Sequence, residues 1–277
     1  MKIKIIVGLI TFLSTLNLYG VDDTGVRYYV KKYMETKMHS PVDSIETISN
    51  YKIPDTGGWE VYFLSLKANI KMGKNYHKKS VPQVVFTKGN KIAFSLKDKS
   101  GKNYAKTLKP KVPLEAYDNA HFLVGDKNAP HKILVMSDPF CPYCQEIVPK
   151  LIDSVKAHPE TFALYYYHLP LLRIHPASDV TTKTMHILHQ RGDVENMKAL
   201  YRLLVDPKEK NSNKILKAIK DKTGLTFTKR EINSNSIKAA LAFDKAMKKR
   251  LMVTGTPTIF IDGIWDPTRM AYKEYIH

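Results

Sequence analysis

Apolar residues recur along the chain with two different periods, and the period changes from one segment to the next. In residues 24–38 the apolar positions have helical spacing, which predicts a helix with Thr24 as a possible N-cap. From residue 41 to residue 97 the pattern changes to short β-rich runs that are separated by glycine-containing turns. The expected strands cover 59–66, 84–87 and 91–96. We therefore expect a small α+β domain at residues 21–98.

A second domain is expected at residues 121–277, after a polar segment at 99–120 whose two prolines are typical of a linker. Its apolar runs predict strands at 132–136, 162–168 and 258–261. Helical patterns cover 141–157, 176–190, 193–205, 211–221, 235–250 and 268–276. The order strand, helix, strand, a helical insertion at about 170–250, strand and helix predicts the α/β class.

The first 20 residues have the pattern of a secretory signal peptide. Lys2 and Lys4 form a positive start, an apolar run follows from Ile5 to Leu13, and Gly20 is a small residue near which cleavage is plausible. The alternative is an uncleaved membrane anchor, but the apolar run is shorter than the ~20 residues that a spanning helix needs. The pattern therefore predicts an exported, periplasmic protein.

The chain is basic, with a formal net charge of +18. Loss of residues 1–20 would leave +16, because that segment contains two lysines and no acidic residue. Such a charge is compatible with binding to nucleic acid or to an anionic membrane surface. The lysines are spread over both halves of the chain, however, and an exported protein rarely meets nucleic acid. We expect a generally basic surface and no nucleic-acid partner.

The only two cysteines of the chain are the ends of Cys141-Pro142-Tyr143-Cys144, directly after a predicted strand and at the start of a predicted helix. A disulfide between such near neighbours would restrain little of the unfolded chain, so stability is a poor explanation for the pair. The unpaired N–H groups and the positive dipole end of a helix N-terminus favour a thiolate. We expect Cys141 to have a depressed pKa and to act as nucleophile, while Cys144, one turn later, resolves the mixed disulfide. Pro142 suits the first helical turn.

The cysteine pair has two other interpretations. A zinc site would need two further ligands, and the chain offers only His186 and His189 at close spacing, which we expect to be an ordinary, partly exposed pair. The other is an inert structural disulfide. Thiol–disulfide chemistry is favoured over both, and we expect no metal and no cofactor.

Residues 138–144 read Asp-Pro-Phe-Cys-Pro-Tyr-Cys, and residues 254–258 read Thr-Gly-Thr-Pro-Thr. These two segments resemble the thioredoxin superfamily, and more closely the periplasmic disulfide isomerase family DsbC/DsbG. Glutaredoxins also carry Cys-Pro-Tyr-Cys, but they are short cytosolic domains, whereas 113 positions separate Cys144 from Pro257 here. The resemblance covers essentially the whole chain after the signal.

The resemblance implies a thioredoxin-like domain with a helical insertion, preceded by a small cystatin-like dimerisation domain and a linker helix. It implies that Thr256 and a cis Pro257 lie beside Cys141 and offer backbone to a substrate. It also implies a homodimer that acts on misfolded or unfolded exported proteins. This chain departs from the family in lacking a second cysteine pair. Val135 stands at the position where thioredoxins hold a buried acidic residue. Asp138 is either a proton relay or a cap of the loop before Cys141, and its position next to the turn favours the cap.

The direction of the reaction depends on the redox poise of the cysteine pair. The strong oxidase DsbA has a histidine between its cysteines, which stabilises the thiolate, whereas Tyr143 offers no positive charge. Together with Thr256, this favours an isomerase or reductase that takes electrons from a membrane reductase of the DsbD type. The alternatives are a dimeric DsbA-like oxidase, which would need a DsbB-type partner, and, from another class, a holdase chaperone.

Overall fold

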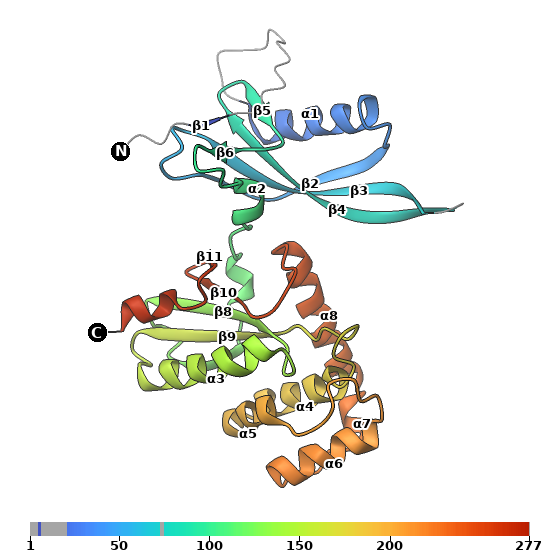
Figure 1. Ribbon diagram of the computed structural model, residues 1–277, viewed down its shortest axis with the longest axis vertical. Helices are drawn as coiled ribbons and strands as arrows, with labels where there is room; N and C mark the ends of the chain where they lie inside the picture. The colour runs from blue at the N-terminus through green and yellow to red at the C-terminus, as the bar shows by residue number, and fades with distance from the viewer. Residues whose placement is uncertain (1–4, 7–20, 73–74, 277) are drawn as a thin grey trace. The chain divides into compact units, whose positions relative to one another are not determined.

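The computed structural model describes residues 5–6, 21–72 and 75–276, and the chain divides into two compact units at 1–110 and 111–277 (Figure 1). The expected signal peptide lies outside the described residues, except that Ile5–Ile6 form a short strand, β1. This strand pairs antiparallel with β6 (Lys97–Asp98). The signal peptide therefore stays a prediction. In the described part of the chain, no helix is long and apolar enough to cross a membrane.

The first unit consists of one helix and an antiparallel sheet. Helix α1 (Asp23–Thr36) is followed by four strands in the order β2-β3-β4-β5. Their bounds are Val42–Lys52 for β2, Glu60–Met72 for β3, Asn75–Lys88 for β4 and Lys91–Ala93 for β5. The helix buries Val26 and Val30 among apolar side chains that include those of β3. The expected helix and three strands are therefore present.

The N-cap of α1 is Asp22, so the expectation for Thr24 is wrong. The Asp22 carboxylate accepts a hydrogen bond from the Gly25 N–H at 2.8 Å. A carboxylate at this position satisfies one of the orphan N–H groups of the first turn, and Thr24 then lies inside the helix.

The segment 99–120, which we expected to be a linker, contains two short helical turns. They are α2 (Tyr104–Thr107) and the 3-10 helix η1 (Leu114–Ala116). The division between the two units follows Pro110 and so falls inside this segment.

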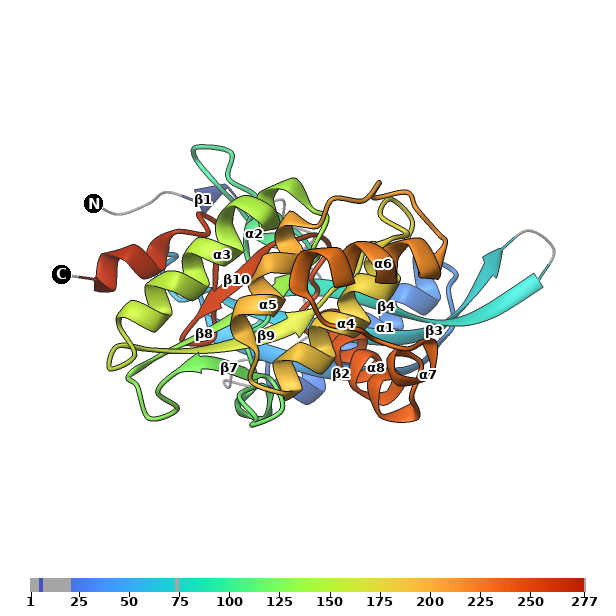
Figure 2. The same ribbon diagram turned by 90° about the horizontal axis from the view of Figure 1, so that it is seen from below.

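The second unit has a five-stranded mixed sheet in the order β11-β10-β8-β9-β7. The strands are β7 (Phe122–Gly125), β8 (His131–Ser137), β9 (Phe162–His168), β10 (Thr258–Ile261) and β11 (Ile264–Asp266). Strands β8 and β9 are parallel, and the other pairs are antiparallel. Helix α3 (Pro142–Ala157) connects the two parallel strands and lies in front of the sheet in Figure 2.

Alternation along the strands gives the sheet two apolar faces. On β8, Ile133 and Val135 belong to the cluster that contains the buried side chains of α3. Leu134 and Met136 belong to a second cluster, which includes Met247 of helix α8 (Asn235–Arg250). On β9, Tyr166 lies in the first cluster and its neighbour Tyr167 in the second. This is the period of two that a strand buried on both faces requires.

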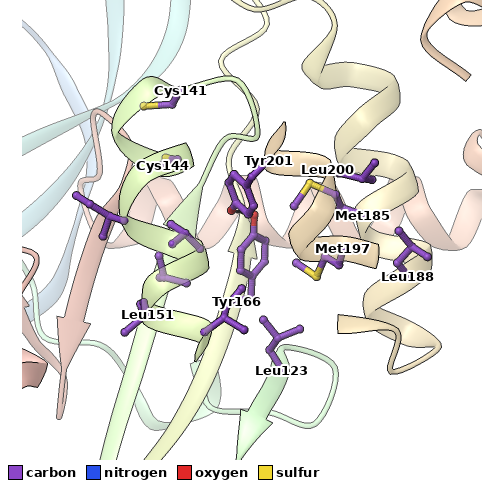
Figure 3. Close-up of a cluster of buried hydrophobic side chains, with 14 of the residues drawn as sticks. Leu123, Cys141, Cys144, Leu151, Tyr166, Met185, Leu188, Met197, Leu200 and Tyr201 are labelled. Carbon is purple, nitrogen blue, oxygen red and sulfur yellow. Dashed lines mark hydrogen bonds between the residues drawn. The ribbon is translucent and has the colours of Figure 1, made fainter. Parts of the chain in front are cut away.

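A block of helices is inserted between β9 and β10, where the sequence predicts it. It consists of α4 (Ser178–Gln190), α5 (Val194–Ala199), η2 (Leu200–Arg202), α6 (Ser212–Thr223), α7 (Lys229–Ile232) and α8 (Asn235–Arg250). Figure 2 shows α4 and α5 beside α3. Their buried residues Met185, Leu188 and Met197 extend the cluster under α3 (Figure 3).

The C-terminal helix expected at 268–276 is not formed over that length, and a 3-10 helix, η3 (Ala271–Tyr275), occurs instead. The Asp266 carboxylate accepts hydrogen bonds from the backbone N–H groups of Thr268 and Ala271. Arg269 lies between them with φ +63°. A right-handed helix cannot continue through Arg269, because its backbone is in the left-handed region. The helix therefore does not form over residues 268–270.

Candidate active site

The cysteine pair lies where strand β8 gives way to helix α3. Cys141 is the N-cap of the helix, Pro142 is its first residue, and Cys144 is one turn further in. The placement at a helix N-terminus is therefore as predicted. Both cysteines are free thiols in the structure. Figure 3 shows Cys144 directly below Cys141, on the side of the helix that faces the buried cluster.

The loop between β8 and α3 is held by the buried carboxylate of Asp138. It accepts hydrogen bonds from the Phe140 N–H at 2.7 Å, the Leu171 N–H at 2.6 Å and the Ser178 hydroxyl at 2.9 Å. The Asp138 carbonyl also accepts from the Cys141 N–H at 3.2 Å. Of the two roles considered for Asp138, this geometry is that of a cap, because the carboxylate is occupied in fixing the loop.

The sulfur of Cys141 is in an environment that favours the thiolate. A hydrogen bond with the Cys144 thiol lowers the Cys141 pKa to about 5, and the N–H groups of Cys144 and Tyr143 act in the same direction, while burial opposes them. These N–H groups belong to the first turn of the helix, where backbone donors have no partner within the helix. At neutral pH Cys141 is therefore mostly ionised.

The sulfur of Cys144 has the opposite character. It is fully buried, and burial raises its pKa well above the usual value for a thiol. The negative charge on Cys141 acts in the same direction. The pair thus consists of a thiolate at the N-cap of the helix and a protonated thiol one turn further in.

The segment before β10 completes the site. The Thr256–Pro257 peptide bond is cis, and both residues are buried. The Thr256 carbonyl lies 3.3 Å from the Cys141 sulfur and accepts a hydrogen bond from its thiol form. The structure therefore brings together Cys141, Cys144 and Thr256, which are far apart in the sequence, with Pro257 directly after Thr256.

The two middle residues of the motif are at the surface. Pro142 and Tyr143 are exposed, and the Tyr143 ring lies under the Arg269 guanidinium at 5.3 Å. Arg269 is a neighbour of the site that sequence reasoning missed. No local pattern could have found it, because its position follows from the Asp266 turn rather than from any spacing to the cysteines.

The histidines that we considered as zinc ligands are part of the interior of the second unit. His189 on α4 is buried, contrary to our expectation for the pair, and its Nε2 is 2.8 Å from the Phe122 carbonyl oxygen. His186 is half-buried. Among the residues that the structure describes, no group of three or more histidine, cysteine or acidic side chains could hold a metal ion.

Comparisons with known proteins give a family and a fold. A family model described as Thioredoxin matches residues 118–275. A thioredoxin-like oxidoreductase from Silicibacter pomeroyi DSS-3 is similar in structure, with a TM-score of 0.50 and 20% sequence identity over 60% of this chain and 96% of that chain. No curated protein matches the chain.

Two further solved structures are less similar. A periplasmic thioredoxin-like protein from Salmonella enterica serovar Typhimurium has a TM-score of 0.48 and 16% identity, over 60% of this chain and 96% of that chain. Oxidised BdbD from Bacillus subtilis has a TM-score of 0.46 and 15% identity, over 60% of this chain and 92% of that chain.

Proposed function

The chain belongs to the thioredoxin family, and we propose that it is a thiol–disulfide oxidoreductase that acts through Cys141 and Cys144. The observation that carries the proposal is the difference between the two sulfurs. The Cys141 pKa is lowered to about 5, whereas burial raises that of Cys144. A nucleophilic thiolate beside a protonated, shielded second thiol is the arrangement that thiol–disulfide exchange needs.

The proposed reaction begins when the Cys141 thiolate attacks a substrate disulfide. A Cys141–substrate disulfide forms, and the other substrate sulfur leaves as a thiolate. In the reductase direction Cys144 then loses its proton and attacks the Cys141 sulfur. The second substrate sulfur leaves and takes up that proton, and the cysteine pair is oxidised by two electrons. In isomerisation a substrate thiolate performs the second attack instead, so that Cys141 is regenerated without net electron transfer.

We propose that Thr256 and Pro257 form the substrate-binding loop of this reaction. The Thr256 carbonyl lies beside the attacking sulfur and is part of the backbone at the start of β10. A substrate segment that pairs with this backbone would bring its disulfide to Cys141.

The finer assignment that we propose is a disulfide isomerase or reductase of the DsbC/DsbG type. It rests on Tyr143, which adds no charge between the cysteines, and on Thr256 before the cis proline. One observation favours a second candidate, the DsbA-like oxidase. A Cys141 pKa of about 5 lies between the values of about 7 for thioredoxin and about 3.5 for DsbA.

The reduction potential separates the two candidates. A value near about −180 mV or below would favour the isomerase or reductase, and one near about −120 mV would favour the oxidase. Trapping by alkylation in the cell gives a second criterion, because an isomerase must keep Cys141 reduced and an oxidase must keep the pair oxidised.

We further propose that the protein is exported to the periplasm and acts on unfolded exported proteins as a homodimer formed by the first unit. Electrons would come from a membrane reductase of the DsbD type. Light scattering on the purified mature chain should give twice the mass of one chain, and a monomer would contradict the dimer.

Loss of either cysteine should separate catalysis from any chaperone activity. Cys141→Ser should abolish both insulin reduction and reactivation of scrambled ribonuclease, because no nucleophile remains. Cys144→Ala should abolish insulin turnover but leave mixed disulfides that can be trapped at Cys141. A variant that lacks both cysteines should not reactivate scrambled ribonuclease. If it still does, the enzymatic proposal is wrong. If it has lost reactivation but still suppresses aggregation, the chain also has a holdase activity that does not depend on the cysteines.

A further inference from the structure

Beneath the cysteine pair the structure holds three buried hydroxyl groups in hydrogen-bond contact, which we call the hydroxyl chain. They belong to Ser137 at the end of β8, Tyr166 on β9 and Tyr201 in η2, and all three residues are fully buried. The Tyr201 hydroxyl is 2.6 Å from the Ser137 hydroxyl and 2.6 Å from the Tyr166 hydroxyl. Figure 3 shows Tyr201 and Tyr166 end to end beside the helix that carries Cys144.

The hydroxyl chain ends at the sulfur of Cys144. The Ser137 side chain interacts with the Cys144 thiol in the direction that lowers its pKa, while the full burial of Cys144 raises it. Three hydroxyls from three different elements thus lead to the one sulfur that must become a nucleophile in the second half of the proposed reaction. Val135, two positions before Ser137 on β8, is an apolar member of the same buried cluster as Cys144.

The physical problem at Cys144 is to form a thiolate in an apolar interior. Burial opposes the charge, while the Ser137 side chain and the Asp138 backbone favour it. Each hydroxyl has one hydrogen, so all three can point the same way, from Tyr166 to Tyr201, from Tyr201 to Ser137, and from Ser137 to Cys144. In this orientation each bond polarises the next, and the Ser137 hydroxyl becomes a better donor.

We propose that the hydroxyl chain stabilises the Cys144 thiolate in the resolving step, with Ser137 as the donor to sulfur and Tyr201 and Tyr166 as positioning residues. The proposal rests on the proposed function. In the step, the bond between Cys144 and Cys141 sulfurs forms while the bond between Cys141 and the substrate sulfur breaks. The electron pair of the broken bond leaves with the substrate sulfur, which takes up the proton released by Cys144. The substrate fragment leaves as a thiol.

The test measures the two half-reactions separately. Reduced protein is mixed with glutathione disulfide and quenched with acid, and mass spectrometry follows the glutathione adduct of Cys141 as it forms and then resolves. In Ser137→Ala and Tyr201→Phe we expect adduct formation at the wild-type rate. Resolution should be slower by about 10-fold or more, because a hydrogen bond to a charged sulfur is lost or weakened. The pH at which resolution reaches its half-maximal rate should move upward in both variants.

Tyr167→Phe is the matched control. Tyr167 is the next residue on β9 and is also fully buried, but its hydroxyl donates to the Ala116 carbonyl at 2.8 Å and its ring lies in the other cluster. Loss of the Tyr167 hydroxyl should leave the rates of adduct formation and adduct resolution unchanged. Tyr201→Phe and Tyr166→Phe keep the shape of the ring, so at least these variants should remain folded if Ser137→Ala does not.

The outcomes distinguish this inference from the function on which it rests. If the wild-type protein forms no adduct, the proposed function is wrong. If the wild type forms and resolves the adduct and the Tyr201→Phe protein does so at the same rates, the hydroxyl chain has no role in resolution. An equal slowing of formation and resolution, or the same slowing in Tyr167→Phe, would assign the effect to packing and overturn the inference.

Discussion

Alkylation of Cys141 by iodoacetamide should be almost independent of pH between pH 6 and pH 8. With a pKa of about 5, the fraction of thiolate rises only from about 90% to nearly all over that range. An ordinary thiol with a pKa of ~8.5 gains roughly 75-fold in thiolate over the same range. The rate should fall below pH 6 and reach half of its maximum near pH 5.

The diagnostic quantity in this experiment is the pH midpoint rather than the absolute rate. A thiolate of low pKa is intrinsically less nucleophilic, so the plateau rate of Cys141 need not exceed that of a free cysteine at high pH. Cys144 serves as the internal control, because a fully buried thiol with a raised pKa should stay unmodified while the fold is intact. A midpoint near pH 8.5 would contradict the assigned role of Cys141.

Asp244→Ala should destabilise the protein by about 3–5 kcal/mol, because it removes one partner of a buried ion pair. The Asp244 carboxylate on α8 is 2.8 Å from His121 Nε2 and accepts a hydrogen bond from the His168 N–H at 2.8 Å. Without it, a histidine ring nitrogen and a backbone N–H would be left unpaired in the interior. The free energy of unfolding in urea measures the loss.

A matched control for this variant is Asp153→Ala. Asp153 pairs with Lys198, but its side chain is 57% exposed, so its loss should cost no more than about 1 kcal/mol. If both variants lose the same free energy of unfolding, the buried Asp244–His121 pair contributes no more to stability than the exposed Asp153–Lys198 pair.

The Asp244→Ala effect should also depend on pH. Burial lowers the His121 pKa and the Asp244 and Asp118 carboxylates raise it, with a net rise. A raised folded-state pKa adds stability that is fully present below the unfolded value of about 6.5 and is lost as the pH rises through the folded value. The difference between wild type and Asp244→Ala should therefore be larger at pH 6 than at pH 9.

Much of the second unit could be predicted from the sequence, because its apolar runs are long and its motif is local. The thioredoxin-like α/β fold is confirmed, and so are the helix that begins after Cys141 and the helical insertion between 162–168 and 258–261. Two end effects were not predictable from periodicity. Asp22 caps the first helix in place of Thr24, and the Asp266 turn prevents a helix at the C-terminus.

The surroundings of Cys144 could not be predicted for a different reason. Ser137 and Tyr201 are 64 positions apart, and Tyr166 is 35 positions before Tyr201. In the sequence each of them is an ordinary strand or helix residue, and only the packing of η2 against β8 and β9 brings the hydroxyls together. The resemblance to DsbC/DsbG and the dimeric first unit remain predictions, since they depend on relationships that a single chain does not display.

Tyr201 belongs to the inserted helices, whereas Cys144 belongs to the strand–helix–strand core. The inserted helices therefore contribute a side chain to the surroundings of the cysteine pair, and the strand–helix–strand core does not supply all of them. A shortened protein in which a tight loop joins β9 directly to β10 would keep the motif and the cis proline. It would nevertheless lose the Tyr201 hydroxyl that contacts Ser137. Other residues would then have to stabilise the Cys144 thiolate.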